Sequence, residues 1–191
     1  TDLWNAGRID TDLLYHNLME VYRYGNVADP RVYVDTFVNY NFNATNIRIA
    51  FARLGAELAR RGEKEKAVEV LDYGLEQMPV SQFQYTYQYL PYIRAYYEAR
   101  ATEKGDALFD SYAKNLEEYV DYFLSFPDNR QYLIENQFAD KLTALAELHR
   151  IAENYGRTDR AARILNLFDW LFGPEGQTDY TEYEQTVLPT E

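Results

Sequence analysis

A set of nine spaced residues between positions 51 and 79 constrains the fold more than any other feature. They are Phe51, Leu54, Gly55, Leu58, Gly62, Ala67, Leu71, Gly74 and Pro79. Apolar residues that recur every three or four positions form one face of a helix, which is the spacing of Phe51, Leu54 and Leu58. The segment 48–79 therefore predicts two amphipathic helices joined by a short turn.

Small residues and helix-ending residues mark the geometry of this pair. Gly55 lies on the apolar face of the first helix, where its missing side chain allows a neighbouring helix to approach closely. Gly62 is expected to end that helix, because glycine adopts the left-handed C-cap conformation without steric cost. Ala67 and Gly74 are small where the helices would cross, and Pro79 cannot continue the second helix. Leu71 is then a core residue.

This spacing resembles one tetratricopeptide (TPR) unit, a helix pair with a period of about 34 residues. The resemblance implies an all-α fold, a right-handed superhelical array of antiparallel helix pairs that serves as a binding scaffold. In such arrays the first helix of each pair lines the concave surface. The expected organisation is a helical lead-in over 1–45, repeats over 46–172 (about 46–79, 82–126 and 129–172), and an irregular tail over 173–191.

Two further pairs are weaker matches to the first. In the second pair Leu90, Ile93 and Tyr97 take the first-helix positions, and the small residues of the second helix are displaced. The third pair repeats the motif at a constant offset through Leu145, Leu148, Ala152, Gly156, Ala161, Leu165 and Phe168. In the lead-in, a helix is expected from Asp10 or Thr11 to about Tyr24, and a short helix is favoured over 31–42.

Composition excludes several classes of function. The net charge of −12 argues against a nucleic-acid partner and against docking on anionic lipid. The absence of cysteine excludes disulfides and thiolate chemistry, although it suits the periplasm and the cytosol equally. No apolar run approaches the length of a membrane span, so direct insertion is not expected. The chain begins at Thr1, which suggests a mature chain or a segment of a longer protein.

No catalytic constellation is apparent. His16 and Glu20 are four residues apart and could share a helix face, but a zinc site needs at least three ligands. No phosphate-binding glycine loop or nucleophile elbow is present. The sequence therefore predicts no catalytic residue, no cofactor and no metal for this chain.

A tyrosine-rich segment, 82–97, is the candidate binding element. Its Tyr85, Tyr89, Tyr92 and Tyr96 form a helical stripe, and Arg94 lies elsewhere on the helix expected over about 82–101. Pro91 should kink that helix or mark an offset start. These residues could line a groove for a peptide or a sugar, or they could fill the core between neighbouring pairs. The sequence does not separate the two.

The chain also resembles, over about 9–170, the soluble C-terminal region of a family of large bacterial membrane proteins. Those proteins are similar to protein O-mannosyltransferases and other C-type glycosyltransferases. The resemblance is carried by Phe51–Leu58, Lys66–Asp72, Pro79 and Tyr89–Ala99. It implies an extracytoplasmic domain tethered to a membrane domain upstream, with the catalytic acids elsewhere.

Three functions remain open at this point. The first is a non-catalytic scaffold that binds a protein or peptide in its concave face. The second is an accessory domain of a membrane glycosyltransferase that binds a glycan or a glycoprotein acceptor. The third is a structural spacer, and burial of the tyrosines in the core would favour it. The expected location is periplasmic, with the cytoplasm as the alternative.

Overall fold

The computed structural model describes residues 7–35, 45–127, 130 and 133–173, and over these residues the fold is helical without strands. The all-α prediction is confirmed. The elements are α1 (Thr11–His16), the π-helical turn η2 (Asn17–Val21), α2 (Thr45–Arg60), α3 (Lys64–Gln77), α4 (Tyr89–Glu98), α5 (Thr102–Leu124), α6 (Glu135–Asn154) and α7 (Thr158–Phe172). The chain divides into two compact units, 1–144 and 145–191, with the boundary inside α6. The expected tail lies outside the described residues, apart from Gly173.

The lead-in helix begins where the sequence predicts and ends earlier. The Asp10 carboxylate accepts a hydrogen bond from the Leu13 amide at 3.0 Å, which caps α1. Leu18 is buried, whereas Val21 and Tyr22 are about half exposed. The cause is the π-helical turn, whose extra residue rotates the positions that follow it. Residues 31–35 are not helical, and the rest of the short helix favoured over 31–42 lies outside the described residues.

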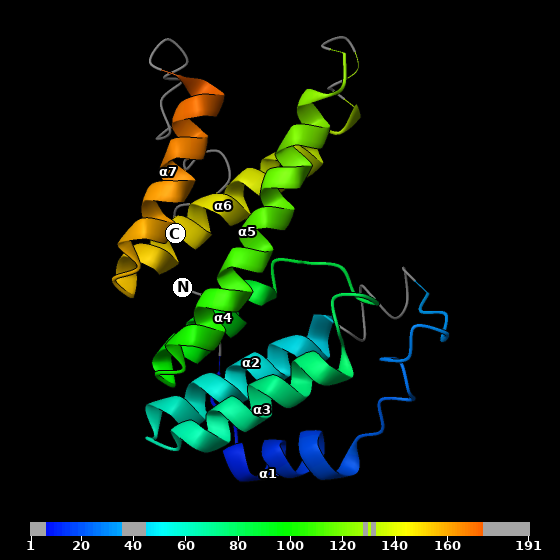
Figure 1. Ribbon diagram of the computed structural model, residues 1–191. Coiled ribbons are helices and arrows are strands. Elements are labelled where there is room, and N and C mark those ends of the chain that lie inside the picture. The colour runs from blue at the N-terminus through cyan, green and yellow to red at the C-terminus, as the bar shows by residue number, and fades with distance from the viewer. Residues whose placement is uncertain (1–6, 36–44, 128–129, 131–132, 174–191) are drawn as a thin grey trace. The chain divides into compact units, whose positions relative to one another are not determined.

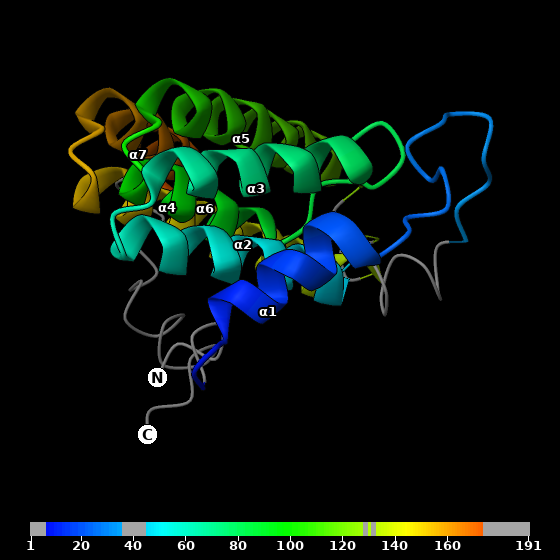
Figure 2. The ribbon, with the colours of Figure 1, turned by 90° about the horizontal axis from the view of Figure 1, so that it is seen from below.

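The first helix pair, α2 and α3, forms as predicted. The two helices lie side by side and antiparallel, with α1 packed against them (Figures 1 and 2). A Cβ added at Gly55 would lie 2.7 Å from Leu71, so the absence of a side chain permits the close approach. Gly74 is closer still to its neighbours, since a Cβ there would lie 2.5 Å from the Tyr92 hydroxyl and 2.8 Å from Phe51 Cγ. Three helices therefore meet at Gly74.

The same turn joins α2 to α3, α4 to α5 and α6 to α7. In each turn one residue has a positive φ: Gly62 (89°), Arg100 (60°) and Gly156 (66°). The residue that follows donates its amide to a carbonyl five residues earlier: Glu63 to Leu58 at 2.9 Å, Ala101 to Tyr96 at 2.9 Å, and Arg157 to Ala152 at 2.7 Å. This is a Schellman C-cap, and it satisfies carbonyls that the helix end leaves unpaired.

These turns correct the register of the second pair. Arg100 occupies the place of Gly62, so Phe51, Leu54 and Leu58 correspond to Tyr89, Tyr92 and Tyr96 rather than to the residues one position later. In this register Ala67 corresponds to Gly105, where a Cβ would lie 2.7 Å from the Tyr97 ring. The small residue of the second helix is thus retained. The sequence hid the register because an arginine stands where glycine would mark the turn.

A buried arginine organises the segment between α3 and α4. Arg48 is 2% exposed, and its guanidinium donates to the carbonyls of Met78 at 3.0 Å and Phe83 at 3.2 Å. It also lies 4.7 Å from the centroid of the Tyr89 ring, within the range of a cation–π contact. No ion pair to Arg48 occurs among the described residues. Carbonyl dipoles and aromatic faces therefore stabilise this charge.

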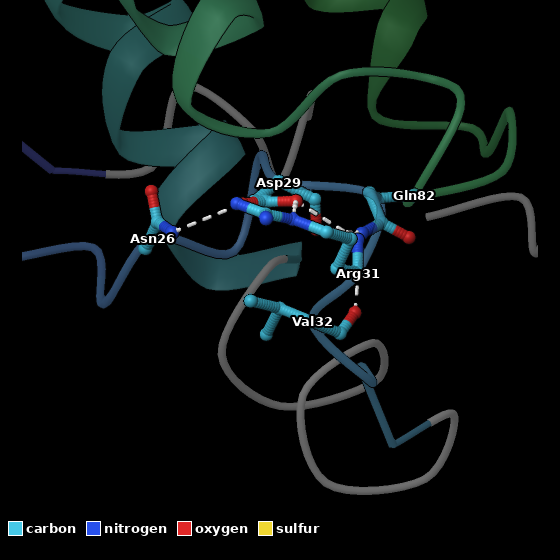
Figure 3. Close-up of polar contacts among 5 residues, drawn as sticks. All are labelled: Asn26, Asp29, Arg31, Val32 and Gln82. Carbon is cyan, nitrogen blue, oxygen red and sulfur yellow. Dashed lines mark hydrogen bonds and ion pairs between the residues drawn. The ribbon is translucent and has the colours of Figure 1, made fainter.

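A second anchor ties the same segment to the loop after η2. The Gln82 side-chain amide donates to the Asp29 carbonyl at 2.5 Å and to the Val32 carbonyl at 3.1 Å (Figure 3). The loop is itself braced by the ion pair between Arg31 and Asp29 at 2.6 Å. Arg48 and Gln82 therefore anchor the residues that precede α4, which form a connection with turns rather than a helix.

The later helices begin and end a few residues away from their predicted limits. α5 ends at Leu124 instead of about 126, and it begins at Thr102, because the Schellman turn ends at Ala101 and the helix follows directly. α6 begins at Glu135 instead of 129, and part of the intervening segment lies outside the described residues. Within the first unit, the rings of Phe123 and Phe138 stack in parallel, which packs the start of α6 against the end of α5.

The second unit contains the end of α6 and the whole of α7. Leu145, Leu148 and Ala152 are fully buried, as the repeat pattern predicts. The assignment of Leu165 to the core was wrong, because its side chain is 47% exposed and Ile164 is buried instead. The buried stripe of α7 is Ala161, Ile164 and Phe168, at the spacing of a single helix face.

Leu71→Ala should lower the free energy of unfolding by about 2–5 kcal/mol, because it removes a fully buried side chain from the contact with Gly55. The matched control is Leu165→Ala, which should cost less than about 1 kcal/mol because Leu165 is half exposed. Denaturant melts of the two variants measure the difference. Equal losses would contradict the assignment of core and surface.

Arg100→Gly should stabilise the protein by about 1 kcal/mol, because glycine adopts the left-handed conformation without the steric cost of a Cβ. The reverse change at the equivalent position, Gly62→Arg, should destabilise by a similar amount. Thermal melts followed by circular dichroism test both. A loss of stability in Arg100→Gly would show that the arginine side chain contributes more than its backbone strain costs.

Candidate functional site

The structure places three of the four tyrosines of the predicted stripe, Tyr89, Tyr92 and Tyr96, in the core. α4 begins at Tyr89, so Tyr85 belongs to the preceding connection, and Pro91 lies in the first turn, where proline is tolerated. Tyr89 and Tyr92 are fully buried and Tyr96 is 2% exposed. These three side chains do not line a shared surface with Arg94, which is only partly buried.

The buried tyrosines contribute to packing through their rings and hydroxyls. The Tyr89 ring lies 6.1 Å from the Tyr112 ring and 6.4 Å from the Tyr92 ring between centroids, and both pairs are tilted. The Tyr96 hydroxyl donates to Asp72 at 2.8 Å. Burial raises the pKa of Tyr92 and Tyr96 well above the ordinary value, since a phenolate would lose its hydration. These phenols therefore remain neutral and structural.

A pocket of about 480 Å³ opens on the face formed by α2 and α4. Its lining from α2 is Ile49, Ala52, Arg53, Ala56, Glu57 and Arg60, with Arg61 from the turn that follows, and its lining from α4 is Pro91, Arg94 and Glu98. The segment 7–9 closes one side through Gly7, Arg8 and Ile9. The pocket thus combines an apolar floor with five arginines and two glutamates.

Glu57 organises two of these arginines. Arg60 donates to both carboxylate oxygens, at 2.8 and 2.5 Å, and Arg61 donates to one of them at 3.0 Å. Hydrogen bonds from Arg60 are the main reason that the pKa of Glu57 falls to about 2. The carboxylate is therefore ionised at neutral pH and holds both guanidinium groups near the pocket rim.

The N-terminal segment is tied to the same pocket. Arg53 Nη2 donates to the Gly7 carbonyl at 3.0 Å, which fixes 7–9 against α2. Arg94 reaches the pocket from the neighbouring helix, one turn after Pro91. Positive side chains from three separate segments thus converge on one cavity in a chain whose net charge is −12.

A second cavity of about 370 Å³ lies between α3 and α5. Tyr85 forms part of its wall and stacks on Tyr112 with ring centroids 5.4 Å apart and planes inclined by 19°. Asp72 and Lys104, which form an ion pair, supply polar groups beside this ring. Of the predicted groove residues, Tyr85 and Tyr96 line this cavity and Arg94 lines the other.

The described part of the chain contains neither a cluster of metal-binding side chains nor a helix that could span a membrane. No group of three or more His, Asp or Glu side chains there could hold a metal ion. His16 and Glu20 do share a face, as expected, with Nδ1 and Oε2 2.7 Å apart. In the same part of the chain, every helix is too short or too polar to cross a bilayer.

Comparisons with known proteins return no relative. No protein-family model matches the chain, and neither a curated protein nor a solved structure is significantly similar to it. The role of the candidate site is therefore inferred from its geometry.

Sequence reasoning identified Arg94 and missed the other arginines. A usable signal was present in α2, where Arg53 and Arg60 are seven residues apart and so share a face opposite Leu54 and Leu58. No periodic signal could place Arg8 there, because its position depends on how the segment before α1 lies against α2.

Glu57→Gln should make the free energy of unfolding fall less steeply as the pH is lowered. The pKa of Glu57 is depressed from 4.5 to about 2, so its pairing stabilises the fold above pH 4.5 and is lost as the pH falls towards 2. Urea denaturation at a series of pH values between about 5 and 2 measures this slope. Glu118→Gln, an exposed α5 glutamate 3.8 Å from Lys114, is the control and should change the slope less. Identical slopes in wild type and Glu57→Gln would contradict the pairing.

Proposed function

We propose that this chain is a non-catalytic, TPR-like scaffold that binds a segment of another protein on the face formed by α2 and α4. The observation that carries the proposal is the pocket on the first helices of two successive pairs. In a helical array, the first helices line the concave surface, which is where binding grooves form. The proposal gives the chain no chemical step.

The repeated turn supports a helical array. Three helix pairs end their first helix with the same Schellman cap, and the second helix starts directly after it in each case. Equivalent residues are also buried in the first two pairs, for example Leu71 in α3 and Phe109 in α5. Repeated local geometry of this kind is typical of solenoid proteins, in which each unit buries its apolar face against the next.

Filling the pocket should abolish binding without changing its charge. Ala56→Trp places an indole in the cavity between α2 and α4. Peptides selected against the wild-type chain from a display library should bind it, as measured by fluorescence polarisation, and should lose affinity for Ala56→Trp by tenfold or more. The control is Lys114→Trp, at an exposed position of α5, which should retain binding. Unchanged binding to Ala56→Trp, or no selected peptide, would contradict the proposal.

A second candidate is an accessory, acceptor-binding domain of an extracytoplasmic membrane glycosyltransferase. The observation that favours it is Tyr85, whose ring borders the second cavity next to Asp72 and Lys104. An aromatic ring with polar neighbours suits stacking and hydrogen bonding to a sugar. Binding of a glycopeptide that is lost in Tyr85→Ala but retained in Ala56→Trp would select this candidate. The reverse pattern would remove it. Apolar spans encoded upstream of Thr1 would support the membrane tether.

A further inference from the structure

We propose that the pocket between α2 and α4 selects a peptide segment rich in carboxylates. This inference is based on the proposed function, because it names the chemistry of the ligand for the same pocket. Arg53 and Arg94 are the contacts assigned to the ligand, and Glu57 competes with the ligand for Arg60 and Arg61.

The charge distribution points to an anionic ligand. Acids outnumber bases by 31 to 19 in the whole chain, whereas five arginines and two glutamates line this pocket. A cavity lined by positive side chains concentrates the electrostatic field inside it, so it attracts anions even in an acidic protein. The net negative charge of the rest of the chain repels anions, so an anionic ligand is captured at this pocket.

Arginine chemistry and the pocket floor favour carboxylate groups. A guanidinium presents a planar fork of donors that matches a carboxylate through two parallel hydrogen bonds. Ile49, Ala52 and Pro91 form apolar parts of the lining. Such surfaces exclude water from a bound side chain, which strengthens the hydrogen bonds beside them.

The volume of the pocket suits a short peptide better than a larger polyanion such as a nucleic acid. A cavity of about 480 Å³ accommodates a few side chains. Nucleic acid is recognised by an extended basic face that neutralises many phosphates, and a chain with a net charge of −12 lacks the overall charge for this. The observations therefore favour a short acidic peptide.

Glu57 gives the pocket an internal competitor for its arginines. Its carboxylate accepts from Arg60 and Arg61, with side chains that are 72% and 42% exposed. Glu57→Gln removes that negative charge while it keeps a similar shape. The two guanidinium groups then become available to a ligand carboxylate, so acidic peptides should bind more tightly to this variant.

Fluorescence polarisation with two synthetic peptides tests the inference on the full chain. One fluorescein-labelled peptide alternates glutamate with alanine, and its matched partner has glutamine in place of glutamate. We expect the acidic peptide to bind and the neutral one to bind at least tenfold more weakly, and the acidic peptide to weaken as salt is added. Arg94→Gln and Arg53→Gln should each reduce its affinity about tenfold, the scale of one charge-assisted hydrogen bond. Glu57→Gln should raise it.

Arg150→Gln is the control, because Arg150 lies in the second unit, outside the lining of the pocket. It should bind the acidic peptide like the wild type, and circular dichroism melts establish that each variant is folded. Equal affinity for both peptides, or no effect of Arg53→Gln and Arg94→Gln, would overturn the inference. Tighter binding of single-stranded oligothymidylate than of the acidic peptide would also overturn it.

These experiments distinguish a failure of the acidic-peptide inference from a failure of the proposed function. Neutral library peptides that bind the wild type and not Ala56→Trp would overturn the acidic preference while the scaffold proposal stands. Loss of all peptide binding would overturn both.

Discussion

The close approach of three helices at Gly74 is the constraint on which the first unit depends. Phe51 from α2 and the Tyr92 hydroxyl from α4 both occupy the space that a side chain on α3 would fill. Because that space is shared, α2 can contact α3 and α4 at once, and the faces of the two first helices lie next to each other. The arginine pocket exists only because this adjacency places Arg53 and Arg94 around one cavity.

The connection before α4 depends on a different interaction. Arg48 brings a positive charge into the core, which is costly unless hydrogen bonds and aromatic faces replace its hydration. The carbonyls of Met78 and Phe83 do so, and they thereby fix the path of the chain into α4. This path places Tyr89 under the buried guanidinium and leaves Tyr85 at the edge of the second cavity.

The tyrosines of α4 are explained mainly by packing. Tyr89, Tyr92 and Tyr96 take the core positions that Phe51, Leu54 and Leu58 take in the first pair, so phenol rings replace smaller apolar groups. Their burial weakens the argument for a tyrosine-lined groove and is the arrangement expected of a spacer. The pocket of arginines beside them is what favours a binding role over a purely structural one.

The sequence by itself determined the helical class, the first helix pair and its turn, because apolar periodicity, glycine caps and Pro79 act over a few residues. It did not determine the register of the second pair, because Arg100 adopts a glycine-like conformation that no local rule predicts. Only tertiary structure decided which tyrosines are buried, since burial depends on the neighbour that covers each face. It also decided the pocket, because Arg8, Arg53 and Arg94 are distant in sequence and meet only when 7–9 and α4 lie against α2.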